Sequence, residues 1–511
     1  MTADPSHRVG GPETARRALL AVSVALLLLV GLSRPNAAQP DLLPRGWAPG
    51  PLLPVSLDPA AVTAVLWGAY GLGAVAVWLG LRGAVPALRS RLVPLGVGAA
   101  ALLTAPFGSA DHVSYVAYGR ILVTGGNPWV ESPVEWGGGA DPVTSRVEAP
   151  WTEEPSVYGP FATLLHGLSA WAGGDSLRQE VWAWQVLVVL AWVGTRAALR
   201  LALPVEQHGR VDVAWTLNPL VVGVGVLGAH VDVVAVGLVV AAVALGVRLA
   251  GPQGAAAAGA ALGLAASTKA TYSIGLLAFA AAAWLVRGDG ARAARDALTR
   301  IALLVVGFVV VAGALQLWAG AHVYDQLARS RQAVSLATPW RPLLEALRPE
   351  LGDADARTVV SVAAAALALV FAVVLLRATR AVGSGSGRPA GWAATALWVL
   401  AGLQLAYVLA APYSLPWYDA LVWAALPAVV PGRVDLLALA RLTVAAVAYV
   451  PGRVLGMTPG VEALTLGFRR EVAPWLVLAL WLALVSVVGA RRASRTVPAP
   501  PRGRPRRSPT R

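Results

Sequence analysis

The stretch NPLVVGVGVLGAHVDVVAVGLVVAAVALGVRLA, residues 218–250, decides which class of fold this chain adopts. Gly223, Gly225 and Gly228 have the Gly-x-Gly-x-x-Gly spacing of a dinucleotide-binding loop. That loop joins a strand to a helix in a soluble unit, whereas these glycines lie inside an apolar run. A run of about 20 apolar residues can cross a membrane, and small residues within it allow close helix packing. The stretch therefore predicts two membrane helices joined by a polar turn.

The whole chain has the composition of a membrane protein. Of its 511 residues, 57% are hydrophobic and 13% are charged, and the mean hydropathy is +0.63, whereas soluble domains carry about 25% charged residues. We therefore expect an all-α, polytopic integral membrane protein with roughly 12-14 transmembrane helices. The candidate spans are 18–33, 60–81, 92–107, 181–199, 211–229, 231–249, 254–271, 273–286, 299–319, 358–376, 391–411, 416–430, 436–451 and 472–489. The chain has no cysteine, which excludes disulfides, thiolate metal sites and cysteine nucleophiles.

The positive charge of the chain is placed as in a multispan protein. The formal net charge is +14, and arginines gather in short loops, such as Arg82, Arg89 and Arg91, and in the C-terminal tail. Cytoplasmic loops carry the excess of Lys and Arg, so an even number of spans leaves both basic tails in the cytoplasm. A basic tail beside a membrane meets anionic lipids rather than nucleic acid.

We therefore expect a multi-pass protein of the plasma membrane, with membrane lipids among its partners and no nucleic acid. Its parts are a cytoplasmic tail 1–17, a transmembrane domain 18–490 and a basic, disordered cytoplasmic tail 491–511.

Two long polar loops are expected on the outer side of the membrane. The first, 108–157, holds seven acidic residues against Arg120 and Arg146. The second, 320–357, has mixed charge, and its Arg329 and Arg331 are candidate substrate contacts. The apolar run 161–171 is too short to cross the membrane, so we expect it to dip in and return or to lie along the surface.

Asp111 is the first candidate for chemistry, because it lies at the mouth of a span. A carboxylate there can take a proton from a sugar hydroxyl, and burial beside apolar helix ends raises a carboxyl pKa. The alternative is a helix cap, since Ser109 and Asp111 both cap helices well. If 112–123 is helical, Tyr115 and Tyr118 share a face with Asp111. These tyrosines either stack on a sugar ring or belong to an interfacial aromatic belt.

Further polar residues lie at the predicted outer ends of other spans. His230 and Asp232 are functional candidates because ionisable residues are costly at membrane depth, although two side chains are too few for a metal site. Lys269, the only lysine, either binds a lipid-borne phosphate or snorkels to headgroups. The other candidate substrate contacts are His112, Glu154, Tyr158, Trp417 and Tyr418. For Glu154 the alternative is a solvated loop charge, and for Trp417 and Tyr418 it is a membrane belt.

The sequence also bears on the donor. It contains no Walker motif, and its polar features gather on the expected outer side, away from nucleotide pools. A group-transfer enzyme on that side needs a donor that arrives in the membrane. A polyprenyl-phosphate sugar meets this need, since a cation can hold the phosphate leaving group while a carboxylate activates the acceptor.

The order of these motifs resembles that of a known family. Asp111-x-x-Ser-Tyr-x-x-x-Gly is followed by Gly125-x-Asn-Pro-Trp, Tyr158-Gly-Pro, Asn218-Pro-Leu, Gly228-x-His-x-Asp, the single lysine and Leu415-Pro-Trp-Tyr. Over about residues 110–420 this order is similar to that of the actinobacterial polyprenyl-phosphomannose-dependent α-1,6-mannosyltransferases. These are GT-C glycosyltransferases that elongate the mannan of lipomannan and lipoarabinomannan.

The resemblance implies a GT-C fold with a large first catalytic extracytoplasmic loop. It implies Asp111 as the base of an inverting displacement, polyprenyl-phosphate mannose as the donor and a lipid-anchored mannan as the acceptor. It places His230, Asp232 and Lys269 around the acceptor or the donor phosphate. Asn127 and Trp129 stand where Asp and Tyr are commoner, which leaves the acceptor and the linkage open. No cofactor is certain, and a divalent metal stays open although no metal ligand is named.

Two other functions remain open from the sequence. A secondary transporter or lipid-carrier flippase would place functional charges near the bilayer midplane on broken helices, whereas here they cluster at outer helix ends. A GT-C glycosyltransferase for another sugar or linkage is also not excluded.

Overall fold

Helices are the regular secondary structure of the residues that the protein's computed structural model describes, which are 11–43, 46–83, 85–249, 251–330, 332–384 and 391–495. Within these ranges there is no β-strand, and the extended pairings are two isolated bridges, Asn36 with Gln39 and Ala381 with Val429. The expected all-α class is therefore confirmed.

Each predicted span coincides with a helix or with a run of short helical segments. Twelve coincide with α1 (Gly11–Leu32), α2 (Pro59–Arg82), α3 (Leu92–Leu103), α6 (Leu177–Ala202), α9 (Val231–Arg248), α10 (Gly251–Thr268), α11 (Ile274–Leu285), α12 (Ala291–Ala319), α14 (Trp340–Ala378), α15 (Trp392–Ala410), α17 (Arg433–Tyr449) and α19 (Ala473–Arg495). One run consists of α7 (His208–Val211), η5 (Asp212–Thr216), α8 (Pro219–Val221) and η6 (Val222–Leu227). The other consists of η9 (Pro416–Asp419), α16 (Ala420–Ala425) and η10 (Leu426–Ala428).

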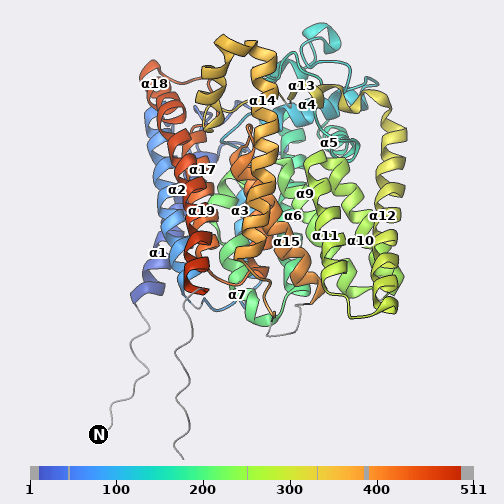
Figure 1. Ribbon diagram of the computed structural model, residues 1–511. Coiled ribbons are helices and arrows are strands. Elements are labelled where there is room, and N and C mark those ends of the chain that lie inside the picture. The colour runs from blue at the N-terminus through green and yellow to red at the C-terminus, as the bar shows by residue number, and fades with distance from the viewer. Residues whose placement is uncertain are drawn as a thin grey trace, which may run out of the picture.

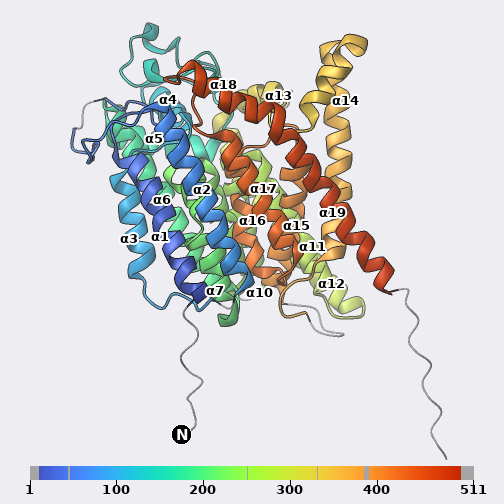
Figure 2. The ribbon, with the colours of Figure 1, turned by 90° about the vertical axis from the view of Figure 1, so that its left-hand side faces the viewer.

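The long helices stand side by side and give the bundle two different ends (Figures 1 and 2). At the upper end lie α4 (Asp111–Val123), α5 (Pro160–Gly173), α13 (Asp325–Ser330) and α18 (Pro459–Gly467). At the lower end lie α7, the start of α1 and the turn between α11 and α12. We call the lower end the arginine-rich end, because it holds Arg16, Arg17, Arg82, Arg196, Arg200, Arg210, Arg287, Arg292 and Arg377 at or near helix termini.

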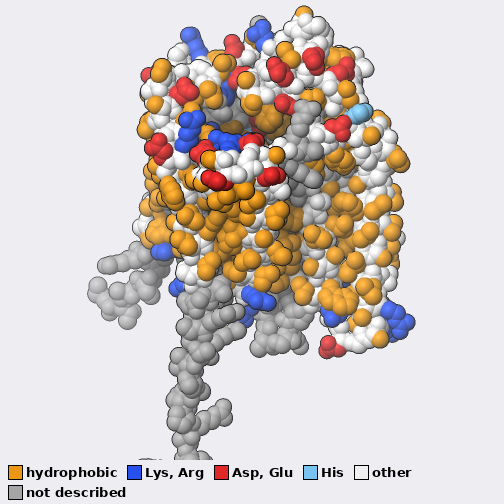
Figure 3. Space-filling model, turned by 45° about the horizontal axis from the view of Figure 1, so that its top comes forward, with side chains coloured by type: hydrophobic (Ala, Val, Ile, Leu, Met, Phe, Trp, Pro, Cys, Tyr) orange, Lys and Arg blue, Asp and Glu red, His pale blue; other side chains and the backbone are white. Residues whose placement is uncertain are grey.

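The surface and the helix lengths are those of a polytopic membrane protein. Within the described residues, eight helical segments are long and apolar enough to cross a membrane, and two shorter apolar helices lie at 92–103 and 270–285. Figure 3 shows a broad band of hydrophobic side chains on the flank, with acidic and basic side chains gathered above it. Helices suit this environment because they satisfy their own backbone hydrogen bonds in lipid. A count of 12-14 crossings stays a prediction.

The two predicted outer loops are largely folded. The first contains α4, and α5 follows it and packs against α4, α6 and α10. At 14 residues, α5 is shorter than the hydrocarbon core of a bilayer. The second contains η8 (Ala321–Tyr324), α13 and the first part of α14, which changes direction at Gly352, where φ is 77°.

Glycines set how closely the helices approach. A Cβ atom on Gly223, in the apparent dinucleotide motif, would meet the side chains of Tyr70 and Leu27. The structure therefore confirms that this motif serves helix packing. Between α10 and α12 the approach is closer still, because a Cβ atom on Gly307 would collide with the carbonyl of Ala256.

We expect Gly307→Val to lower the thermal stability of the purified protein in detergent, because the new side chain forces α10 and α12 apart. Overpacking of this kind costs about 1–3 kcal/mol. Gly313→Val is the matched control, since Gly313 lies on the same helix and a Cβ atom there would have no neighbouring atom within 4 Å. Equal losses of thermal stability in the two variants would contradict this account of the α10–α12 contact.

Candidate active site

Asp111 is the first residue of α4, at the upper end of the bundle. The chain enters α4 through Gly108, whose φ of +85° favours glycine and whose N–H donates to the carbonyl of Ala38 at 2.8 Å. The N–H of Asp111 donates to Ser109 Oγ at 3.2 Å. Ala110 occupies the cap position, and no described backbone N–H donates to the Asp111 carboxylate. The carboxylate is therefore not used as a helix cap.

His230 joins the start of α9 to Asp111. Its Nδ1 lies 3.6 Å from Asp111 Oδ2 and 3.3 Å from the Tyr115 hydroxyl. Its Nε2 lies 3.3 Å from Ser109 Oγ. The imidazole stacks on the indole of Trp417, with ring centroids 3.4 Å apart. The structure thus brings His230 and Trp417 to Asp111 and Tyr115, the pair that the sequence already placed on one helix face.

The environment of Asp111 shifts its pKa from 3.8 to about 7. Burial raises the pKa most, since only 14% of the side chain is exposed. Lys269 lowers it, Asp232 raises it, and hydrogen bonding by Trp151 and Tyr115 lowers it. A carboxyl group that titrates near neutrality is suited to act as a general base.

A second polar group lies between the start of α9 and the end of α10. Lys269 Nζ lies 2.9 Å and 3.0 Å from the two carboxylate oxygens of Asp232. The Tyr272 hydroxyl donates to Asp232 Oδ1 at 2.9 Å, and Lys269 Nζ lies 3.7 Å from the centre of the Tyr418 ring. A positive charge at this depth is unfavourable without an anionic partner, and Asp232 is that partner for Lys269. A role for Lys269 toward substrate stays a prediction.

Aromatic rings surround Tyr115. Tyr158 meets it edge-on at 4.9 Å, and His166 stacks parallel to it at 5.2 Å. Gly119 makes this possible, because a Cβ atom there would collide with the carbonyl of His166 and separate α4 from α5. Tyr115 is fully buried in this cluster, so it orders the site rather than forming an open stacking surface.

Hydrogen bonds hold the acidic loop between α4 and α5 against the site. The Tyr118 hydroxyl donates to the carbonyl of Glu154 at 2.9 Å, and Trp129 Nε1 donates to the carbonyl of Tyr158 at 2.8 Å. The N–H of Gly159 donates to the carbonyl of Thr268. The Tyr-Gly-Pro motif therefore docks onto the end of α10, beside Lys269.

Among the other predicted contacts, His112 makes no hydrogen bond to this cluster. His112 is fully buried, burial lowers its pKa to about 3, and neither ring nitrogen has a hydrogen-bond partner within the described part of the chain. Arg329 belongs to α13, but its side chain lies outside the described residues, and so does Arg331. Within the described ranges, no three His, Asp or Glu side chains form a group that could hold a metal ion.

Sequence reasoning missed several residues of the site. Ser109 was considered only as a cap, and Trp151, His166 and Tyr272 were not singled out. Tyr272 follows Lys269 by three residues in KATYS, a spacing that would have suggested a shared partner. Trp151 and His166 have no comparable signal, because only the folded loop brings them to α4.

Comparison with known proteins gives three findings. The family model described as Alpha-(1->6)-mannopyranosyltransferase, N-terminal domain, matches residues 22–287. Alpha-(1->6)-mannopyranosyltransferase A of Mycobacterium tuberculosis is 30% identical over 383 residues, which are 69% of this chain and 68% of that protein. Alpha-(1->6)-mannopyranosyltransferase B of Corynebacterium glutamicum is 27% identical over 351 residues, 64% of this chain and 56% of that protein. No solved structure matches the chain.

The helical membrane fold, its polar site and these matches define a membrane glycosyltransferase. The chain belongs to the alpha-(1->6)-mannopyranosyltransferase family and is therefore a mannosyltransferase.

We expect the Lys269–Asp232 pair to be strongly coupled. Lys269→Met and Asp232→Leu should each lower the unfolding temperature in detergent, because each leaves a largely buried charge without its partner, a loss of about 3–5 kcal/mol. The double variant should lose clearly less than the sum of the two single losses. A thermal-unfolding cycle with additive losses would contradict the coupling.

Proposed function

We propose that this protein transfers mannose from polyprenyl-phosphate mannose to a growing α-1,6-mannan on a lipid-anchored acceptor, at the outer face of the plasma membrane. The observation that carries the proposal is the Asp111 carboxylate, placed beside His230 at the upper end of the bundle with a pKa raised to about 7. The relatives are named as alpha-(1->6)-mannopyranosyltransferases, which supports the sugar and the linkage.

The arrangement of charge supports the outer face. The arginine-rich end corresponds to the cytoplasmic side by the positive-inside rule. Asp111, His230 and Lys269 belong to the opposite half of the bundle, where α4 begins, α9 begins and α10 ends. A donor used on that side must be carried by the membrane, which favours a lipid-linked sugar.

The proposed reaction is a single displacement. Asp111 accepts the proton of the acceptor hydroxyl while the oxygen of that hydroxyl forms a bond to the anomeric carbon of mannose. The bond from that carbon to the phosphate oxygen breaks, and the phosphate leaves with the bonding electron pair. Attack from the opposite face inverts the anomeric centre, so a β-linked donor yields an α-linked product. Asp111 then releases the proton to water.

Neighbouring groups prepare Asp111 for this role. Ser109 and Tyr115 contact the His230 ring nitrogens, and Trp417 covers one face of that ring. His230 is thereby held at 3.6 Å from the carboxylate without a short ion pair that would keep the carboxylate from its substrate. His230 is thus a positioning residue for Asp111.

Asp111→Asn should lower mannose transfer in membranes by at least about 100-fold, because an amide cannot accept the hydroxyl proton. The assay uses radiolabelled polyprenyl-phosphate mannose and short α-mannosides. Glu135→Gln, an exposed change in the same loop, should keep wild-type activity. Undiminished transfer by the folded Asp111→Asn protein would remove Asp111 as the base. Transfer from GDP-mannose in membranes free of polyprenyl phosphate would refute the donor.

The absence of cysteine allows a direct test of sidedness. Glu153 is exposed in the loop after α4, and Asp289 is exposed in the turn between α11 and α12. We expect a membrane-impermeant maleimide to label Glu153→Cys in intact cells. It should label Asp289→Cys only after the cells are permeabilised. The reverse pattern would place Asp111 on the cytoplasmic side and contradict the proposed topology.

A further inference from the structure

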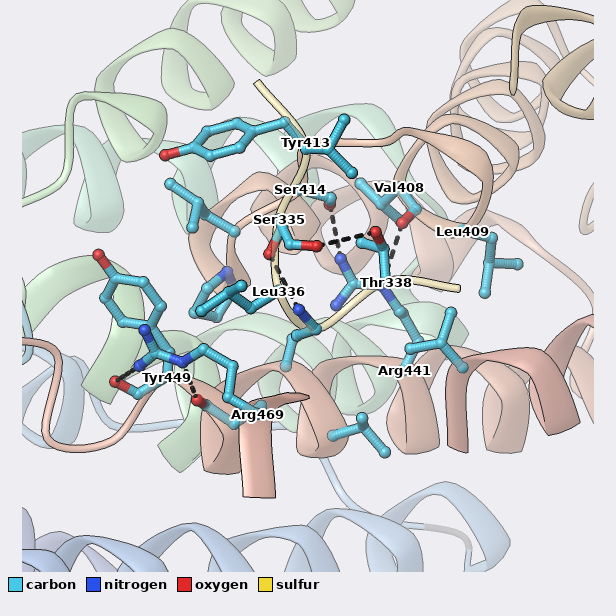
Figure 4. Close-up of a pocket in the computed structure, with 18 residues that line it drawn as sticks. Ser335, Leu336, Thr338, Val408, Leu409, Tyr413, Ser414, Arg441, Tyr449 and Arg469 are labelled. Carbon is cyan, nitrogen blue, oxygen red and sulfur yellow. Dashed lines mark hydrogen bonds between the residues drawn. The ribbon is translucent and has the colours of Figure 1, made fainter. Parts of the chain in front are cut away.

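A polar cavity lined in part by residues 413–416, directly before Trp417 in the chain, was not anticipated from the sequence. Its volume is about 270 Å³, near the lower end of ligand pockets, which run from about 300 to 1,000 Å³. Figure 4 shows Arg441 from α17 and Arg469 from η11 (Phe468–Val472) at this cavity, together with Tyr413, Ser414, Ser335 and Tyr449. Leu336, Leu409, Val444 and Val477 supply apolar walls.

Arg441 is a buried cation whose positive charge is only weakly paired with a carboxylate. Its side chain is only 4% exposed. Nε donates to the carbonyl of Val408 at 3.2 Å, and Nη2 donates to Ser414 Oγ at 2.6 Å. Its acidic neighbour, Asp419, lies at 3.4 Å, and neither carboxylate oxygen of Asp419 accepts a hydrogen bond within the described structure. Arg441 is thus held mainly by neutral acceptors.

Arg469 carries the excess charge of the cavity. Nε donates to the carbonyl of Ala448 at 2.7 Å, Nη2 donates to the carbonyl of Tyr449 at 3.0 Å, and the guanidinium lies 4.9 Å from the centre of the Tyr449 ring. No carboxylate of the described chain forms an ion pair with Arg469. Among the described residues, Asp419 is the carboxylate within ion-pair distance of Arg441, and none pairs with Arg469, which leaves a net positive charge in a cavity with apolar walls.

Each arginine also keeps a donor for a ligand. The hydrogen bonds of Arg441 and Arg469 use Nε and Nη2, so Nη1 of neither one has an acceptor among the described residues. Guanidinium groups recognise phosphate oxygens with strong, charge-assisted hydrogen bonds. The excess charge, these donors and the apolar walls fit a phosphate group attached to a hydrocarbon chain.

The cavity adjoins the Asp111 site through shared aromatic neighbours. Leu415 and Pro416 line it, and the next residue, Trp417, stacks on His230. Tyr449 meets Trp417 edge-on at 5.1 Å. The Asp111 charge acts on both Tyr413 and Tyr449, two residues of the cavity wall. A phosphate in this cavity would therefore be separated from His230 by Trp417 and would share the neighbouring residues Tyr413 and Tyr449 with the Asp111 site.

We propose that this cavity binds the phosphate end of the polyprenyl-phosphate donor, with Arg469 and Arg441 as the phosphate ligands and the apolar walls around the first isoprenoid unit. The inference rests on the proposed donor and extends it by naming the residues that hold the leaving group. Lys269 is neutralised by Asp232, so the arginines supply the cationic charge that this phosphate requires.

The arginines contribute more as the reaction proceeds. The donor phosphodiester carries one negative charge, and the departing phosphate monoester gains a second when it takes the electron pair of the broken bond. Preorganised donors aimed at developing charge stabilise the transition state. Loss of Arg469 should therefore raise the donor KM and also lower kcat.

The test measures binding of the leaving group without catalysis. Full-length protein in nanodiscs of neutral phosphatidylcholine is titrated with polyprenyl phosphate, and binding is followed by the rise in thermal stability. We expect Arg469→Gln to raise the apparent Kd for polyprenyl phosphate at least about 10-fold. Arg469→Lys should recover part of the lost affinity. Arg470→Gln is the matched control, because Arg470 is the exposed neighbour on the same helical turn. It should bind as wild type.

Three outcomes overturn the inference. The first is unchanged binding by the folded Arg469→Gln protein, and the second is equal weakening by Arg470→Gln. The third is displacement of polyprenyl phosphate by equimolar phosphatidylglycerol, which would assign the cavity to phospholipid headgroups.

Asp111→Asn separates this inference from the proposed function. It should bind polyprenyl phosphate as wild type while losing transfer. If Asp111→Asn loses transfer but Arg469→Gln binds normally, the proposed function stands and the phosphate site falls. If wild type transfers mannose from GDP-mannose alone, the assignment of polyprenyl-phosphate mannose as donor is wrong. The proposed phosphate site, which rests on that donor, is then wrong as well.

Discussion

The ion pair between Lys269 and Asp232 determines the electrostatics of the whole site. It joins the start of α9 to the end of α10, and it neutralises the single lysine of the chain close to the Asp111 carboxylate. No Lys or Arg of the described chain forms an ion pair with Asp111, and burial raises its pKa more than Lys269 lowers it. Because Lys269 is paired with Asp232, a negatively charged substrate group needs other cations. Arg441 and Arg469, which line the cavity next to Trp417, are the candidates. A base with a near-neutral pKa and a separate anion site both follow from this one pairing.

The fold places these groups by bringing helix ends together rather than by a dedicated domain. Asp111 begins α4, His230 precedes α9, Lys269 follows α10, and Trp417 belongs to the short η9 segment after α15. Glycines make the junctions close: Gly119 sets α4 against α5, and Gly159 sets the following turn against the end of α10. Because polar groups at helix ends need partners in a membrane protein, these junctions also hold the hydrogen bonds of the site. Fold stability and catalytic geometry therefore depend on the same contacts.

Much of this was predictable from the sequence. Apolar runs located each span, since a membrane helix is read from length and hydropathy alone. Candidate residues at span ends were also predictable, because ionisable groups there are costly. Their pairing was not, and Lys269 was expected to face a phosphate or lipid headgroups rather than Asp232. Tyr115 was expected to stack on a sugar ring or to belong to an aromatic belt, whereas it is buried against His166. The Arg441–Arg469 cavity had no local signal, because its residues come from α15, α17, η11, α19 and two loops that only the tertiary fold unites. Spacing along one chain reports periodicity, but it does not report which distant segments meet.

The central claim is that Asp111 is the catalytic base and that its burial tunes its pKa to the neutral range. The most direct measurement is the pH dependence of single-turnover mannose transfer at saturating donor. A carboxyl group with a raised pKa is protonated, and inactive as a base, below that pKa. We therefore expect the rate to rise with pH through one ionisation near about 7. A rate that does not change with pH across the neutral range, or an acid limb near the ordinary carboxyl pKa, would contradict the account.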